Sequence, residues 1–195
     1  MSRHAADFAG IPADMTDENA LLRAALAEAQ RRIGELERDA ESDTVTPLPG
    51  ARRFRAELER VVGLGERHGS TAALVGIELT GLASLRDRHG DLAADSALVH
   101  VARLLSGLIR STDILARTGD QAFGLILDHL DHNSAIDTAE RLGRCIAANP
   151  LDLGREVVPL EAIVATTGIM PGDKVEEVLA RADRNLALAR TEARP

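Results

Sequence analysis

The sequence predicts an α+β domain, with a central, mostly antiparallel sheet surrounded by helices and preceded by a coiled-coil helix. Three observations support this prediction. Apolar runs of strand length alternate with amphipathic helical patterns from residue 43 onward. Two of the strand patterns flank a turn at Gly119-Asp120, which is the signature of a hairpin. A segment with two prolines and a glycine, residues 47–50, separates this region from a long helical pattern near the amino terminus. Mixed strands and helices around a hairpin are typical of α+β domains.

The first 42 residues predict a tail and a helix. Residues 1–14 lack hydrophobic periodicity, so we expect a flexible tail. Thr16 fits the N-cap of a helix through the proline-free segment 15–42. Within it apolar residues alternate in steps of three and four, the heptad pattern of a coiled coil, with Leu22, Ala29 and Leu36 at d and Asn19, Leu26, Ile33 and Ala40 at a. We interpret this helix as a homodimer interface. The alternative is an amphipathic helix packed on its own domain.

The segment 43–195 predicts the elements of one domain. An amphipathic helix begins near Arg52, and the apolar run at 72–79 has the length of a strand. The pattern at 91–109 predicts a helix, because it gathers apolar residues on one helical face, namely Leu98, Val101, Ala102, Leu105 and Leu108. The remaining patterns predict strands at 114–116, 123–127, 157–160 and 162–168, and helices at 134–148 and 174–190.

Composition excludes several classes of function. Apolar residues make up 45% of the chain and charged residues 28%, as in soluble globular proteins. The net charge of −8 and the 2% of aromatic residues argue against a nucleic-acid partner. The chain has no apolar run of signal-peptide or membrane-spanning length, and the single Cys145 suits a reducing compartment. We therefore expect a cytoplasmic protein with no membrane partner.

Two neighbouring motifs carry the chemistry. Arg110-Ser111-Thr112-Asp113 precedes Arg117-Thr118-Gly119-Asp120-Gln121-Ala122-Phe123 by three residues. This arrangement resembles the GGDEF (diguanylate cyclase) family, whose active-site turn reads Arg-x-Gly-Gly-Asp/Glu-Glu-Phe and whose inhibitory site reads Arg-x-x-Asp. Further segments match the family in register, at 43–54, 75–82, 86–95 and 182–190. The resemblance covers 43–195 and implies a GGDEF, nucleotidyl-cyclase-like domain.

The resemblance also indicates that the active site is degenerate. The family's chemistry needs two Mg²⁺ ions held by carboxylates of a strand and of the turn. Here neutral Gln121 and Ala122 stand at the acidic positions of the turn, and Arg86 replaces the asparagine that reads the base. The degenerate positions are Glu78, Arg86, Gly119, Asp120, Gln121 and Ala122. We expect no catalytic residues, no cofactor, no metal and no cyclase activity. An open alternative is that Asp120 and Glu78 rebuild a single metal site.

The upstream motif is intact. An arginine guanidinium matches the O6/N7 edge of guanine, and a carboxylate can accept from the N1–H and N2–H₂ edge. The resemblance implies a cyclic di-GMP site formed by Arg110, Asp113 and Arg141, the last at the position of the family's second arginine. The alternative is a surface Arg–Asp ion pair, worth at most about 1 kcal/mol.

The resemblance therefore implies a bacterial cyclic di-GMP receptor, a homodimer through the coiled coil that signals to an unidentified protein partner. A ligand-independent scaffold or dimerisation module is the alternative. A weak diguanylate cyclase or a GTP-binding allosteric domain is the least favoured interpretation.

Overall fold

The structure, a computed structural model, describes residues 22–26, 28, 42–128, 130 and 132–193. It divides into two compact units, Met1–Asp39 and Ala40–Pro195. The predicted tail at 1–14 lies outside the described residues.

Most of the predicted coiled coil at 15–42 also lies outside the described residues. Residues 22–26 are helical, and Leu22 and Leu26 are exposed. Because the other heptad positions are not described, the coiled coil stays a prediction. Ser42, the last residue of the predicted helix, instead forms an isolated antiparallel bridge with Pro49.

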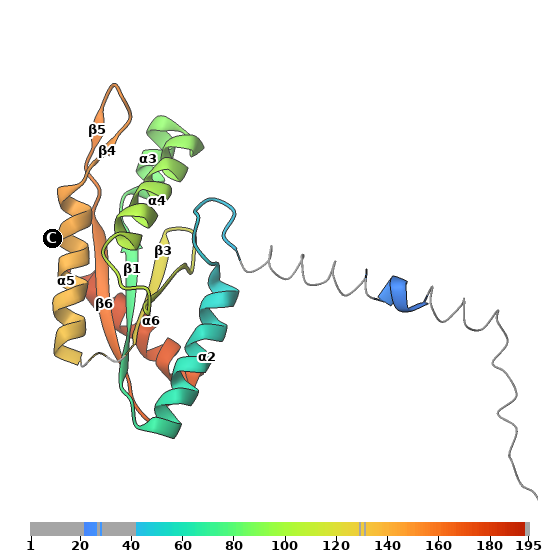
Figure 1. The fold of residues 1–195 in the computed structure, drawn as a ribbon. Helices are drawn as coiled ribbons and strands as arrows, with labels where there is room; N and C mark the ends of the chain where they lie inside the picture. The colour runs from blue at the N-terminus through green and yellow to red at the C-terminus, as the bar shows by residue number, and fades with distance from the viewer. Residues whose placement is uncertain (1–21, 27, 29–41, 129, 131, 194–195) are drawn as a thin grey trace, which may run out of the picture. The chain divides into compact units, whose positions relative to one another are not determined.

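The centre of the second unit is a four-stranded sheet in the order β2-β3-β1-β6 (Figure 1). Its strands are β1 (Ala72–Leu79), β2 (Ile114–Arg117), β3 (Ala122–Asp128) and β6 (Ala162–Ile169). Every neighbouring pair is antiparallel, and β1 lies between β3 and β6. A separate two-stranded sheet pairs β4 (Leu151–Asp152) with β5 (Val157–Val158). The predicted antiparallel α+β fold is confirmed.

Helices cover both faces of the sheet (Figure 1). They are α2 (Ala51–His68), α3 (Leu82–His89), α4 (Asp91–Ser106), α5 (His132–Ala148) and α6 (Val175–Glu192). None of the helices in the described ranges combines the length and apolar character needed to cross a membrane.

Alternation along the strands divides the core in two, because successive side chains of a strand point to opposite faces. On β1, Val75 and Ile77 pack in one cluster with residues of α3, α4 and α5, whereas Leu74 packs in the other with residues of α2 and α6. On β3, Leu125 and Ile126 divide in the same way. The sheet therefore separates two helical layers.

Element ends differ from prediction where local chemistry outweighs periodicity. The helix predicted at 91–109 ends at Ser106, and Gly107 forms its C-cap. The strand predicted at 157–160 is only Val157–Val158, because Pro159 cannot donate a ladder hydrogen bond. Its partner β4 has two residues, too few for a sequence pattern to reveal.

Gly124 permits α2 to approach the sheet closely. A Cβ at this position of β3 would lie 2.6 Å from Cζ of Phe54 and 2.8 Å from Cγ2 of Thr118. The Phe54 ring is 4% exposed and cannot swing into solvent without leaving its core cluster.

Gly124→Ala should therefore lower the free energy of unfolding by about 1–3 kcal/mol, the usual cost of overpacking a core. Urea unfolding followed by circular dichroism measures it. Gly63→Ala on α2 is the matched control, because nothing lies within 4 Å of its added Cβ and alanine favours a helix. Equal stability of Gly124→Ala and wild type would contradict this account of the close approach.

Candidate functional site

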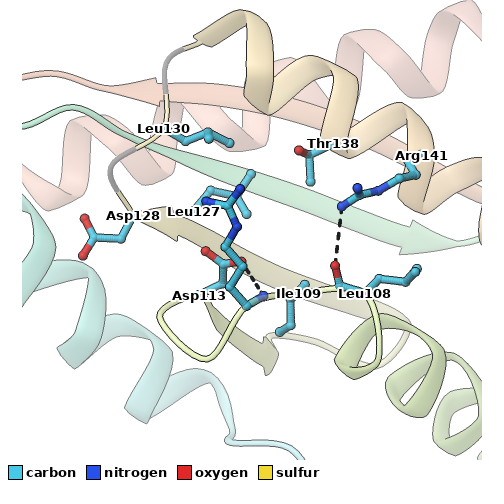
Figure 2. A pocket seen from close by; sticks show the side chains of 9 residues that line it. Leu108, Ile109, Asp113, Leu127, Asp128, Leu130, Thr138 and Arg141 are labelled. Carbon is cyan, nitrogen blue, oxygen red and sulfur yellow. Dashed lines mark hydrogen bonds between the residues drawn. The ribbon is translucent and has the colours of Figure 1, made fainter.

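The three residues predicted to bind ligand line one cavity of about 200 Å³ (Figure 2). Arg110 and Asp113 belong to the connection between α4 and β2, and Arg141 belongs to α5. The cavity is completed by Leu108, Ile109, Leu127, Asp128, Leu130 and Thr138. Segments about 30 residues apart in sequence thus meet at this cavity, as antiparallel packing of helices and strands allows.

The segment from Arg110 to Asp113 is a turn closed by two reciprocal hydrogen bonds. The backbone N–H of Arg110 donates to Oδ2 of Asp113 at 2.8 Å, and the backbone N–H of Asp113 donates to the carbonyl of Arg110 at 3.1 Å. The carboxylate is held by the backbone, and the Arg110 guanidinium makes no ion pair with any residue in the described ranges. These contacts therefore differ from a simple surface ion pair between the two side chains.

Arg141 reaches across the cavity from α5. Its guanidinium points toward the α4–β2 connection and donates to the carbonyl of Leu108 at 3.4 Å (Figure 2). This distance is long for a hydrogen bond, so the contact is weak. The Arg141 guanidinium can exchange it for a stronger, charged acceptor.

Asp128 and Thr138 also line the cavity, although the sequence analysis did not select them. Asp128 ends β3, and the pairing of Ile114 with Ile126 brings that strand end beside the Arg110–Asp113 turn. Thr138 precedes Arg141 by three residues on α5 and so shares its helical face. Strand register could have predicted Asp128 from the sequence, and helical spacing from Arg141 could have predicted Thr138.

The turn between β2 and β3 is held by Arg117. Its Nε donates to the carbonyl of Gly119 at 3.1 Å, and one terminal nitrogen donates to the carbonyl of Asp120 at 2.8 Å. The other terminal nitrogen lies 2.9 Å from Oδ1 of Asp43. One guanidinium thus supports the turn and ties it to the segment that precedes α2.

Asp43 and Arg117 are partly buried partners, with 11% and 12% of their side chains exposed. Oδ2 of Asp43 also accepts from the backbone N–H groups of Val45 and Thr46 and from the Thr46 hydroxyl. Burial alone would raise the pKa of Asp43, but hydrogen bonds from Thr46, Val45 and Arg117 outweigh it and hold that pKa below its ordinary value.

The strand position expected to hold a metal is already engaged. Glu78, near the end of β1, has 12% of its side chain exposed. Its Oε1 accepts from the amide nitrogen of Gln121 at 3.0 Å, and its Oε2 forms an ion pair with Arg190 of α6. These three residues line a second cavity, of about 420 Å³.

The remaining positions predicted to be degenerate differ in their relation to Glu78, because Ala122 is its cross-strand partner whereas Arg86 does not line its cavity. Arg86 forms an exposed ion pair with Asp91 at 3.0 Å, and Gly119, Asp120 and Ala122 do not line the cavity at Glu78. Within the described ranges, no three His, Cys, Asp or Glu side chains are grouped to hold a metal ion. Asp120 therefore does not share the cavity of Glu78, and a single metal site rebuilt from these two carboxylates stays a prediction.

Comparison with known proteins identifies the fold. The family model described as "Diguanylate cyclase, GGDEF domain" matches residues 40–195. This chain belongs to the GGDEF domain family. The family's signature turn reads Gly-Asp-Gln-Ala-Phe here, from Gly119 to Phe123.

Two curated relatives and one solved structure illustrate the similarity. The chain is 27% identical over 176 residues to the bifunctional diguanylate cyclase/cyclic di-GMP phosphodiesterase MucR of Pseudomonas aeruginosa, and 26% identical over 183 residues to the diguanylate cyclase DgcP of the same species. These matches cover 89% and 87% of this chain, but only 25% and 27% of the relatives. The chain therefore spans about a quarter of their length.

The coiled coil and GGDEF domain of DgcB from Caulobacter crescentus, solved in complex with c-di-GMP, superposes with a TM-score of 0.78 at 21% identity. The match covers 92% of this chain and 96% of that one. At this identity the likeness shows the fold alone.

The residues of this GGDEF domain do not fit the two Mg²⁺ ions that the family's chemistry implies. Mg²⁺ requires hard oxygen ligands, whereas Gln121 presents its NH₂ group to Glu78 and Ala122 has no donor atom. Glu78 already has a cationic partner in Arg190.

The buried Asp43 carboxylate should make the domain sensitive to acid. Because its pKa is lowered in the folded state, its stabilising contribution is complete above the unfolded pKa of about 3.9 and is lost as pH falls through the folded pKa. Asp43→Asn should cost about 1–3 kcal/mol of unfolding free energy at neutral pH, and this difference from wild type should shrink below about pH 4.

Denaturant unfolding at several pH values measures both effects. Asp87→Asn is the control, because it removes the same charge from an exposed position of α3. A cost for Asp43→Asn that stays constant from neutral to acid pH would show that the charge of Asp43 does not stabilise the fold.

Proposed function

We propose that this GGDEF domain is a catalytically inactive receptor for cyclic di-GMP, which binds at Arg110, Asp113 and Arg141. The observation that carries the proposal is the convergence of these residues on one cavity. The guanidinium of Arg110 makes no ion pair with the described residues, and that of Arg141 makes one weak contact. Both cations are therefore available to a ligand.

The chemistry of the cavity suits a guanine base and a phosphate. Oδ2 of Asp113 accepts the Arg110 N–H, which leaves Oδ1 to accept from the N1–H and N2–H₂ edge of guanine. The Arg110 guanidinium supplies paired donors for the O6/N7 edge. Arg141, on the opposite wall, is placed to pair with a phosphate oxygen.

The size of the cavity limits how much of the ligand it encloses. Its 200 Å³ is below the roughly 300–1,000 Å³ of pockets that enclose drug-sized ligands. A base can enter, but most of a dinucleotide remains on the surface, where a second molecule or domain can cover it. Ligand would then favour the arrangement that brings a second basic surface to this site.

We propose that the domain acts in the bacterial cytoplasm, as a homodimer through the helix at 15–42, and passes the signal to a protein partner.

The absence of catalysis follows from the turn. With Gln121 and Ala122 at the acidic positions, neither of these positions supplies a carboxylate to join Glu78 in holding a metal, and Glu78 is paired with Arg190. We expect no cyclic di-GMP from GTP in the presence of Mg²⁺ or Mn²⁺.

Isothermal titration calorimetry of the full chain with cyclic di-GMP tests the receptor. Wild type should bind, and Arg110→Ala should weaken binding by about 10- to 100-fold, because hydrogen bonds to a charged group are lost. Arg103→Ala is the matched control, since Arg103 is exposed on α4 and does not line the cavity. It should bind as wild type does.

Two outcomes would contradict this function. If wild type gives no heat of binding, the domain is a ligand-independent scaffold or dimerisation module. If chromatography detects cyclic di-GMP formed from GTP, the domain is a cyclase and not an inactive receptor.

A further inference from the structure

We propose that Arg190 is a built-in replacement for a divalent cation, whose guanidinium neutralises Glu78 and fastens the carboxy-terminal end of α6 to β1. The family's metal requirement is not met by the residues at this position, since Gln121 and Arg190 already satisfy Glu78. This inference does not depend on ligand binding at Arg110.

Glu78 needs a cationic partner because most of its side chain is removed from water. It is paired with Ala122 on β3 and with Ile163 on β6, so its backbone lies inside the sheet. Only 12% of its side chain is exposed, and a carboxylate removed from water is costly unless it is paired and hydrogen-bonded. A bound cation is one solution, and a guanidinium from a neighbouring helix is another.

Both oxygens of Glu78 are satisfied without a metal. Oε1 accepts from Gln121, and Oε2 accepts from Arg190. The backbone N–H of Leu79 donates to the carbonyl of Gln121 at 2.9 Å, which holds Gln121 beside Glu78. A metal ion bound by both oxygens of this carboxylate would have to replace the Gln121 amide and the Arg190 guanidinium.

The ion pair also completes the attachment of α6. The buried residues of this helix are Val175 and Val178, both in its first turn. Farther along, Asn185 donates to the carbonyl of Thr166 at 2.9 Å and to the hydroxyl of Thr167 at 3.0 Å. Arg190 is the next polar anchor. Among the described contacts, the Arg190 ion pair is the one that joins the last turn of α6 to β1, which makes Arg190 a positioning residue.

A double-mutant cycle on thermal unfolding tests the pairing. Arg190→Met and Glu78→Gln should each lower the midpoint by about 2–4 °C, the shift expected for a half-exposed pair worth about 1 kcal/mol. The double variant should lose no more than the larger single loss, because the two changes remove one interaction. Arg190→Lys should retain most of the stability.

Hydrogen exchange locates the effect. Arg190→Met should speed amide exchange at the end of α6, from about Leu186 onward, while exchange in α4 stays as in wild type. Arg184→Met is the control, because Arg184 is an exposed arginine of α6 with no ion pair to the described residues. Strictly additive losses in the cycle, or unchanged exchange in α6, would overturn the positioning role.

Manganese titration tests the replacement of the cation. Wild type should show no saturable Mn²⁺ binding at Glu78. The variant Gln121→Glu/Arg190→Met places two carboxylates together without the guanidinium, and it should gain Mn²⁺ binding that a further Glu78→Gln change abolishes. A folded variant that gains no Mn²⁺ site, or a wild-type Mn²⁺ site abolished by Glu78→Gln, would overturn the proposal.

Cyclic di-GMP affinity should be the same in wild type, Arg190→Met and Gln121→Glu/Arg190→Met, because the Arg110 cavity does not include these residues. Loss of affinity in the Arg190 variants would contradict the independence of the two sites. Failure of wild type to bind cyclic di-GMP would count against the receptor and leave the Mn²⁺ result to be judged by itself.

Discussion

The partly buried ion pair between Asp43 and Arg117 is the interaction that ties the β2–β3 turn to the segment before α2. Arg117 is the last residue of β2, and its guanidinium contacts the segment before α2 on one side and the β2–β3 turn on the other. Removing either partner leaves a buried charge without compensation, which costs far more than an exposed ion pair contributes. The Arg117 guanidinium therefore holds the hairpin in shape through contacts with the backbone of its turn.

The two ends of β2 have opposite electrostatic character. At its beginning, the Arg110–Asp113 turn satisfies its carboxylate with backbone N–H groups, so the arginine is left for an external partner. Near its end, across the turn, Gln121 and Arg190 satisfy Glu78 from within the chain. The first region is where we propose that an anionic ligand binds. The other has been closed by internal pairing, because its polar groups already have partners.

The Arg110–Asp113 turn and the Glu78 contacts can coexist in one fold because the four-stranded sheet and its two apolar cores do not depend on either of them. Val75 and Leu74 of β1 pack on opposite faces whatever occupies the end of the strand. Substitution at Glu78, Gln121 or Arg190 changes polar contacts at the rim of the sheet. The architecture of this GGDEF domain therefore does not depend on acidic residues in the turn, since hydrophobic burial supplies most of the stability.

Much of this protein could be predicted from the amino-acid sequence. Alternation and helical periodicity predicted most of the strands and helices of 43–195, but not α3 or β4, because local propensity is a property of short segments. The resemblance to the GGDEF family singled out Arg110, Asp113 and Arg141. The ends of α4 and β5 were missed by two or three residues, since Gly107 and Pro159 act through backbone chemistry that periodicity does not report.

Only the tertiary structure decided which charges meet. The pairing of Glu78 with Arg190, 112 residues away, and the place of Asp128 beside the Arg110 turn depend on strand register and helix packing. No local pattern encodes such long-range contacts, because they form when the sheet and its covering helices assemble.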